Sequence, residues 1–359
     1  MFFSLSFTTV CIFTFLTAFL IVCISTPVII RVARLKSLLD EPGGRKLHNE
    51  SIPTLGGIAI FSGTLISFSL FRDYLGLNDV RFMIPAILCL FLIGLKDDIL
   101  IISPWTKLLG QITVAGLIVF FGDLRITSLY GVLGFTAIDL FPSILFSVLT
   151  VVVIINAFNL IDGINGLAGG IGLISASAFA TWFLLTNNIG LALLALSLAG
   201  SLLAFLIFNL VKPKIFMGEI GPMITGLILS ICAIQFIELN KHMESVGNFD
   251  YWIRASPVVA IAFLFLPLFD LLRVFIIRIY IGKSPLVADT NHIHHTLIRS
   301  GFSHLQSSLL LYLVQIFFML LAIYFRDLRS SHLLPILLLG AMLFVFTASW
   351  YEKRYCLKC

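Results

Sequence analysis

The sequence is poor in charged residues. Asp, Glu, Lys and Arg make up 11% of its 359 residues, whereas soluble domains usually carry about 25%. Hydrophobic residues make up 59% of the chain and the mean hydropathy is +1.09. This balance excludes an ordinary soluble protein. The long apolar runs instead predict membrane-spanning helices, each of which needs about 20 mainly apolar residues.

Paired cysteines and a secretion signal are also lacking. The six cysteines are scattered, and only Cys356 and Cys359 have metal-site spacing. One such pair cannot complete a zinc site, so zinc is not favoured there. No basic residue precedes the first apolar run, and several follow it. We therefore expect a retained first helix and not a cleaved signal peptide.

The apolar runs predict an all-α, polytopic membrane protein with about eleven transmembrane helices. No soluble domain or long linker is visible, so residues 1–359 form one transmembrane domain. We see no internal repeat, which gives no support to the inverted-repeat architecture of many transporters. The expected spans are residues 5–29, 54–71, 82–97, 107–121, 141–157, 167–185, 189–208, 222–238, 255–276, 307–325 and 333–350.

Basic residues divide the connecting segments into two unequal sets. The larger set contains Arg31, Arg34, Lys36, Arg45, Lys46, Lys96, Lys107, Lys212, Lys214, Arg278, Lys283, Arg299, Lys353, Arg354 and Lys358. The smaller set contains Arg72, Arg81, Arg125, Lys241, Arg254, Arg326 and Arg329. The positive-inside rule places the larger set in the cytoplasm. With an odd number of spans, the N-terminus is then outside and the C-terminus inside, in the inner (plasma) membrane.

Two adjacent carboxylates interrupt the apolar pattern in "GLKDDIL", at the cytoplasmic end of the third span. A charged side chain at the centre of a membrane helix costs about 3 kcal/mol, so Asp97 and Asp98 need a reason to be there. Glu219 stands on a glycine-containing loop in "FMGEIGP". A solvated glutamate is the plain interpretation of that residue. If it faces the aspartates, the three would form a magnesium site, because magnesium is usually held by one or two carboxylates plus substrate phosphates.

Amide and acid groups recur in "NAFNLIDGINGLAGG" on the same predicted side. A spacing of three places neighbouring members near one face if the segment is helical, and its glycines allow a ligand to approach closely. We favour a binding site over a polar helix cap with small packing residues. The members are Asn156, Asn159, Asp162 and Asn165.

Histidines and cations form two further clusters. The first is "HIHH", with His292, His294 and His295; phosphate contact is favoured over a metal site or a structural role because basic residues lie nearby. The second is "RKLHNESIPTLGG", with Arg45, Lys46 and His48, which would bind lipid head groups or a phosphorylated substrate. Together with the carboxylates, these clusters suit phosphoryl transfer, which depends on positioning and charge neutralisation.

The five motifs, in this order, resemble those of the polyprenyl-phosphate N-acetylhexosamine-1-phosphate transferases. Relatives of that family include the phospho-N-acetylmuramoyl-pentapeptide transferase of peptidoglycan synthesis. The resemblance covers nearly the whole chain, and "ADTNHIHH" is closer to the sugar-phosphate branch, which includes UDP-GlcNAc:undecaprenyl-phosphate transferases.

The resemblance implies a reaction in which a polyprenyl phosphate attacks the β-phosphorus of a UDP-N-acetylhexosamine. UMP leaves, and the lipid-linked sugar begins a cell-surface glycan. Magnesium is implied, with manganese as the alternative. By motif position, Asp97 and Asp98 are catalytic and hold the metal with Glu219. The implied substrate-binding residues are Arg45, Lys46, His48, Lys107, Asn156, Asn159, Asp162, Asn165, Asn209, His292, His294 and His295.

Two positions depart from the family's usual pattern. Glu219 and Asn165 stand where family members usually have aspartate. Glutamate can still bind magnesium, and asparagine keeps a carbonyl acceptor but loses a charge. The alternatives are a relative with altered catalysis that uses another UDP-N-acetyl sugar, and a membrane transporter. Nothing indicates a nucleic-acid partner, and homodimer formation is left open.

Overall fold

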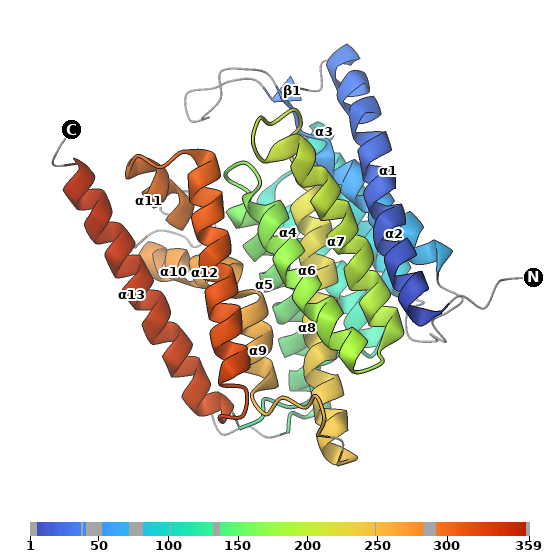
Figure 1. Ribbon diagram of the computed structural model, residues 1–359, viewed down its shortest axis with the longest axis vertical. Coiled ribbons are helices and arrows are strands. Elements are labelled where there is room, and N and C mark those ends of the chain that lie inside the picture. The colour runs from blue at the N-terminus through green and yellow to red at the C-terminus, as the bar shows by residue number, and fades with distance from the viewer. Residues whose placement is uncertain are drawn as a thin grey trace, which may run out of the picture.

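The computed structural model describes residues 6–36, 39–40, 52–71, 82–100, 102–131, 137–247, 249–282 and 292–356. Arg45, Lys46, His48 and Cys359, all singled out from the sequence, lie outside these residues. The described chain is an all-α bundle, as predicted (Figure 1). Its only described strands are a two-residue antiparallel pair, β1 (Leu39–Asp40) and β2 (Ile52–Pro53).

Helices follow one another along the chain. They are α1 (Phe7–Leu35), α2 (Gly56–Leu70), α3 (Met83–Leu100), α4 (Pro104–Gly116) with its π-helical continuation η3 (Leu117–Phe121), α5 (Leu140–Ile161), α6 (Leu167–Leu185), α7 (Ile189–Asn209), α8 (Ile220–Ser245), α9 (Ser256–Phe263), α10 (Phe265–Tyr280), α11 (Ile293–Arg299), α12 (His304–Tyr324) and α13 (Ser330–Cys356).

Eight of the described helical segments are long and apolar enough to cross a membrane, or nine if the bent pair α9 and α10 counts as one span. A polytopic membrane protein is therefore confirmed. Helix α2 has only 15 residues, fewer than the roughly 20 of a usual span, and α3 carries Lys96, Asp97 and Asp98 near its end. The number eleven stays a prediction.

The span expected over residues 255–276 is not one straight helix. Helices α9 and α10 meet at Leu264 with an angle of 87°. Pro267 gives a local reason, because a proline lacks an N–H and its ring clashes with the carbonyl four residues earlier. That carbonyl belongs to Phe263, and it accepts hydrogen bonds from Ser175 Oγ at 2.6 Å and Gln315 Nε2 at 2.9 Å. Buried side chains thus replace the hydrogen bonds that the broken helix loses.

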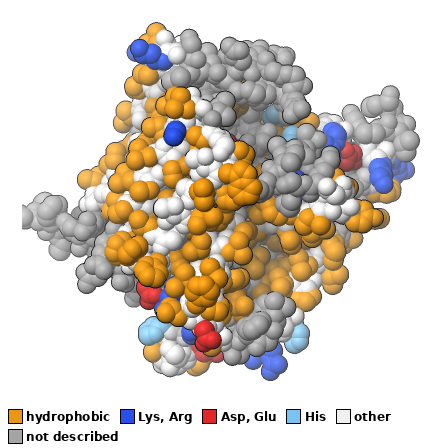
Figure 2. Space-filling model, turned by 180° about the vertical axis from the view of Figure 1, so that it is seen from behind, with side chains coloured by type: hydrophobic (Ala, Val, Ile, Leu, Met, Phe, Trp, Pro, Cys, Tyr) orange, Lys and Arg blue, Asp and Glu red, His pale blue; other side chains and the backbone are white. Residues whose placement is uncertain are grey.

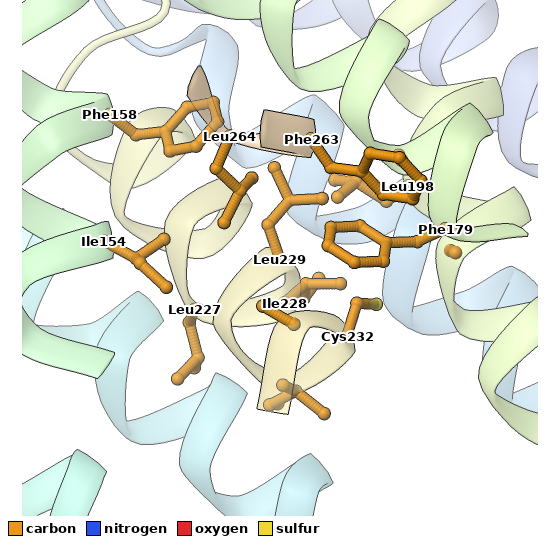
Figure 3. Close-up of a cluster of buried hydrophobic side chains, with 14 of the residues drawn as sticks. Ile154, Phe158, Phe179, Leu198, Leu227, Ile228, Leu229, Cys232, Phe263 and Leu264 are labelled. Atoms are coloured by element: carbon orange, nitrogen blue, oxygen red, sulfur yellow. The ribbon is translucent and has the colours of Figure 1, made fainter. Parts of the chain in front are cut away.

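Helix α8 is the centre of the bundle. Its most apolar 18-residue window is 94% buried inside the protein, compared with 17% for α13 at the edge. In Figure 3, Leu227, Ile228 and Cys232 of α8 lie among side chains of neighbouring helices, including Phe158 of α5 and Phe179 of α6. Because α8 is packed on all sides, the loop that begins it is held in a defined place.

The outer surface is predominantly apolar. Large hydrophobic side chains are exposed on α1, α12 and α13, among them Ile24, Leu313 and Phe346. On the face that Figure 2 shows, hydrophobic side chains cover the middle of the molecule, and charged groups lie towards its two ends. Exposed apolar area on this scale is expected of a surface that faces lipid.

Candidate active site

The loop before α8 is held by backbone hydrogen bonds to the segment before α2. Phe216 N donates to Pro53 O at 2.7 Å, Gly56 N to Phe216 O at 2.9 Å, and Gly57 N to Met217 O at 2.8 Å. The motifs "IPTLGG" and "FMGEIGP", more than 150 residues apart, are therefore paired like two strands. This pairing fixes the backbone that carries Glu219.

Gly218 makes the turn possible. Its φ is +68°, and a Cβ atom there would lie 1.9 Å from Thr54 O and within 3 Å of both carboxylate oxygens of Asp98. Any other residue would strain the backbone and collide with it. The glycine therefore allows Asp98 to approach the start of α8.

Asp98 caps α8. Glu219 N donates to Asp98 Oδ1 at 2.7 Å, and Ile220 N donates to Asp98 Oδ2 at 3.3 Å. The first N–H groups of a helix have no partner within the helix, and a carboxyl side chain is a favourable acceptor for them. Both oxygens of Asp98 thus hold the last turn of α3 against the first turn of α8.

Asp97, Lys107 and Glu219 form a mixed-charge group beside this cap. Asp97 is buried, and its Oδ1 accepts a hydrogen bond from Ile102 N at 3.0 Å. Lys107 lies in the first turn of α4, which Ser103 caps. Its Nζ is 3.3 Å from Asp97 Oδ2 and also donates to Glu219 Oε2. Three helices therefore bring one cation and three carboxyl groups together.

The loop between α5 and α6 is held from two sides. Gly166 begins α6 with φ at +76°, and its N–H donates to Asn209 Oδ1 at 2.6 Å. Asn209 Nδ2 donates in turn to Ile215 O at 2.8 Å. From α12, Ser308 Oγ donates to Asn165 O at 2.8 Å and Tyr312 OH donates to Gly166 O. The amide of Asn209 therefore ties the loop before α6 to the loop before α8.

Asp162 stands on this loop, immediately after α5. Burial, with smaller contributions from the nearby carboxylates of Glu219 and Asp98, raises its pKa to about 8. The effect of Glu219 and Asp98 on this pKa indicates that their carboxyl groups lie near that of Asp162. A cation at this position would favour the ionised form of Asp162.

The histidine motif reaches the same loop from α11. His294 is 1% exposed, and neither of its ring nitrogens has a hydrogen-bond partner among the described residues. A Cβ on Gly163 would lie 2.3 Å from its Nε2, so the ring packs directly on the Asp162–Gly163 turn. Burial lowers the pKa of His294, and the neighbouring histidines His295 and His292 lower it further. The ring is therefore neutral at pH 7, with one donor and one acceptor nitrogen.

Comparison with known proteins identifies the family. A sequence model of glycosyl transferase family 4 matches residues 80–237, which contain the aspartate pair, the Asn156–Asn165 cluster and Glu219. The chain is 34% identical over 321 residues to a probable undecaprenyl-phosphate N-acetylglucosaminyl 1-phosphate transferase of Bacillus subtilis, covering 87% of this chain and 84% of that relative. The chain belongs to glycosyl transferase family 4.

Other similar members carry related names. A decaprenyl-phosphate N-acetylglucosaminephosphotransferase of Mycobacterium leprae is 34% identical, covering 83% of this chain and 79% of the relative. An undecaprenyl-phosphate alpha-N-acetylglucosaminyl 1-phosphate transferase of Escherichia coli K12 is 29% identical, covering 91% and 86%. The resemblance drawn from the five motifs is thereby confirmed.

Within this family 4 site, the predicted residues have different local contacts. Asn156 Nδ2 donates to Gln111 Oε1 at 2.7 Å, which joins α5 to α4. Asn159 Oδ1 is buried without a partner among the described residues. Helix α5 ends at Ile161, so only Asn156 and Asn159 share a helical face. Asp162 and Asn165 lie on the turn beyond, because the glycines that follow end the helix.

The described residues contain no group of three His, Cys, Asp or Glu side chains that could by themselves hold a metal ion. Lys107 pairs with both Asp97 and Glu219, and both oxygens of Asp98 accept backbone N–H groups. Among these carboxylates, Glu219, which is 43% exposed, and the half-buried Asp162 have the fewest hydrogen bonds and ion pairs with other protein groups. This set fits magnesium held by one or two carboxylates and completed by substrate phosphates.

Two residues of the site were missed in the sequence. Asp270 of α10 accepts hydrogen bonds from the histidine segment, and Tyr312 of α12 holds the α5–α6 loop. Asp270 had a readable signal, because "FLPLFDLL" places an acid inside an apolar run, where acids usually have a function. Tyr312 had none, since an aromatic residue in an apolar helix is ordinary.

Proposed function

We propose that this chain transfers N-acetylglucosamine-1-phosphate from UDP-N-acetylglucosamine to a polyprenyl phosphate. The observation that carries the proposal is the meeting of the carboxyl groups of Asp98, Asp162 and Glu219 with Lys107 and His294 at one end of an apolar bundle. The names of the relatives in Bacillus subtilis and Mycobacterium leprae support the same acceptor and sugar. The product would begin lipid-linked glycan synthesis.

The chemistry explains why such a site lies at a membrane edge. The acceptor is a phosphate on a lipid, and the donor is a water-soluble nucleotide sugar, so both reach only the polar end of the bundle. An oxygen of the lipid phosphate attacks the β-phosphorus of the donor. The bond from that phosphorus to the oxygen bridging the two phosphates breaks, and UMP carries away that oxygen and its electron pair. Catalysis then consists mainly of charge neutralisation and alignment.

Each group has a proposed role in that alignment. Glu219 and Asp162 would hold magnesium (or manganese), which supplies positive charge to the diphosphate when bound. Lys107 supplies further positive charge. Asp98 fixes α8, and Asp97, close to Lys107, is placed to accept a proton from the lipid phosphate.

The remaining polar groups suit the donor. His294 can donate one hydrogen bond to a phosphate or sugar oxygen, and its other nitrogen can accept one from a sugar hydroxyl. His292 and His295 lie beside it, with ring centroids 5.6 Å and 4.3 Å away. Asn159, with its unpartnered oxygen, and Asn165 are proposed to contact the nucleotide.

The orientation of the bundle is a further part of the proposal. Helix α1 begins at the end opposite the site, and α13 ends on the site's side (Figure 1). Twelve described basic residues lie near the site-side ends of helices or on α10 and α11, which carry and hold the histidine segment: Arg31, Arg34, Lys36, Lys96, Lys107, Lys212, Lys214, Arg273, Arg278, Arg299, Lys353 and Arg354. Five lie near the opposite ends of the helices: Arg125, Lys241, Arg254, Arg326 and Arg329. The positive-inside rule therefore supports a plasma-membrane protein with its site and C-terminus in the cytoplasm. A reporter fused after Cys359 tests this, and a periplasmic signal contradicts it.

UMP release tests the reaction. Purified protein in detergent is mixed with undecaprenyl phosphate and UDP-N-acetylglucosamine, with magnesium or with a chelator. We expect release that needs both the lipid and the metal, and that is lost in Asp162→Asn. Release without lipid would indicate hydrolysis and not transfer. No release with any of several UDP-N-acetyl sugars would refute the transferase and favour a relative with altered catalysis.

A further inference from the structure

The histidine-bearing helix α11 is too short to hold its own position. It has seven residues, whereas an isolated helix needs about 12–15 to be even marginally stable in water. Two carboxylates on other helices hold it. Asp270 of α10 contacts its beginning, and Glu352 of α13 accepts a hydrogen bond from Arg299 Nε at its end.

Asp270 uses both of its oxygens on the histidine segment. The residue is completely buried, at 0% exposure. Ile293 N donates to Asp270 Oδ1 at 3.0 Å, and His292 Nδ1 lies 2.9 Å from Asp270 Oδ2. The guanidinium of Arg273, 3.6 Å from Oδ1, supplies a nearby positive charge. One carboxylate therefore fixes the first backbone N–H of α11 and the ring of the histidine before it.

This contact also selects the tautomer of His292. A carboxylate at hydrogen-bond distance requires a proton on Nδ1, which leaves Nε2 on the opposite side of the ring. In many enzymes and metal sites, such a carboxylate fixes which ring nitrogen carries the proton and how the ring is oriented. The ring of His292 lies nearly parallel to that of His294, at 8°, and His294 packs on Gly163 beside Asp162.

The bend between α9 and α10 carries Asp270 to this place. Gln315 of α12 stabilises the bend from both sides, because its Nε2 donates to Ala262 O and Phe263 O while its Oε1 accepts from Leu266 N. Helix α10 therefore runs across the bundle and not along it (Figure 1). Asp270 is thus held by the fold independently of α11.

We propose that Asp270 is a positioning residue for the transfer reaction, which fixes the Nδ1-protonated tautomer of His292 and the orientation of α11 without touching substrate. It acts through His292 on the phosphates of the donor. The inference rests on the function proposed above. It distinguishes Asp270 from Glu219 and Asp162, which are proposed to hold the metal.

Glu238 offers a matched control for the test. It lies on α8 at the far end of the bundle, and it also accepts two hydrogen bonds, from Thr127 N and Thr127 Oγ1, both at 2.7 Å. Asp270→Asn and Glu238→Gln therefore make the same chemical change in the same kind of contact. We expect both to lower Tm, but only Asp270→Asn to lower kcat/KM, by roughly 10- to 100-fold. A value within twofold of wild type, or equal losses in both variants, would overturn the proposal.

A double variant tests whether Asp270 acts through His292. If it does, Asp270→Asn should cost little further activity in a chain that already carries His292→Ala. Losses that multiply would show that Asp270 contributes by another route, and the proposal would fail.

A direct measurement does not depend on activity or on the stability of Asp270→Asn. The chain has seven histidines, so nitrogen NMR of ¹⁵N-histidine-labelled protein in detergent can be assigned for His292 by comparison with His292→Gln. We expect wild type to carry the His292 proton on Nδ1; a ring protonated on Nε2 alone overturns the inference. If wild type releases no UMP, the proposed function fails, while the tautomer still decides whether Asp270 holds His292.

Discussion

Asp97 and Asp98 are adjacent, yet their contacts predict different effects of the same substitution. Asp98 accepts the N–H groups of both Glu219 and Ile220, and asparagine has only one oxygen to offer them. One buried N–H at the start of α8 would then face an NH₂ group. The loss of a helix-capping hydrogen bond costs about 0.5–2 kcal/mol. We therefore expect Asp98→Asn to lower the free energy of unfolding by about 1–2 kcal/mol, which in a chain of 359 residues corresponds to a Tm decrease of roughly 1–3 °C.

Asp97→Asn should behave differently. Its remaining oxygen can still accept from Ile102 N, and Lys107 keeps its pair with Glu219. The substitution removes the 3.3 Å contact between Lys107 and the buried Asp97, but it leaves no buried charge without a partner, because Glu219 still pairs with the lysine. We expect Tm close to wild type but no UMP release.

The assay is thermal unfolding of both variants in the same detergent, beside UMP release at a temperature where both are folded. Equal Tm values for the two variants would refute the assignment of Asp98 as the cap of α8. Retained UMP release in Asp97→Asn would refute its place in the reacting group.

Three further changes test other parts of the site. Burial raises the pKa of Asp162 to about 8 in the folded protein, above its ordinary value of about 3.9, so the fold keeps a proton that the unfolded chain loses between about pH 4 and 8. The stability of the folded protein must then fall as pH rises through this window. Asp162→Asn should flatten the dependence of Tm on pH between pH 5 and 9 and raise Tm at pH 9. Parallel Tm curves for the variant and wild type would contradict this. Gly218→Ala should destabilise the protein more than Gly247→Ala, because both glycines have positive φ but only Gly218 has an atom, Thr54 O, in the way; equal Tm losses would show that the loop adjusts. Glu219→Asp should retain or increase UMP release, because the shorter acid restores the family's usual residue, whereas complete loss would show that the loop is built around glutamate.

Long apolar runs made the main helices predictable. The span predicted at residues 167–185 coincides with α6, and that at 189–208 differs from α7 by one residue. Each run is longer than 18 residues and ends at polar or glycine residues, so its limits are visible locally. The bend at Leu264 is different. Pro267 gave a local signal, but Gln315, which makes the bend stable, comes from a helix about 50 residues later.

The members of the site were easier to predict than their contacts. Acids, amides and histidines in apolar surroundings are conspicuous in any sequence, and so Asp97, Asp98, Glu219 and His294 were found. The sequence gives the two aspartates the same expected roles and does not reveal that Asp98 accepts a hydrogen bond from Ile220 N, 122 residues away. Such a contact depends on how α3 packs on α8, and no local pattern records it.

The site consists of two halves that are built on different supports. The carboxylate half is attached to α8, because Asp98, Lys107 and the Thr54–Gly57 segment all contact the loop or first turn of that buried helix. The histidine half is attached to α10 and α13 through Asp270 and Glu352. The halves meet where His294 packs on Gly163. Helix α12 contacts both of them. Its Ser308 and Tyr312 hold the α5–α6 loop, and its Gln315 holds the bend before α10.

Helix α12 thus connects the two halves of the site. Changes in α12 that leave every polar residue of the site intact should still impair the reaction, because they shift the histidines relative to the carboxylates. The hydrogen bonds of Gln315 are all with backbone groups of the bend, so we expect it to affect the reaction through the position of α10. This dependence explains why a site with such conspicuous residues requires apolar helices far from the reacting atoms: alignment in phosphoryl transfer is sensitive to displacements of about 1 Å.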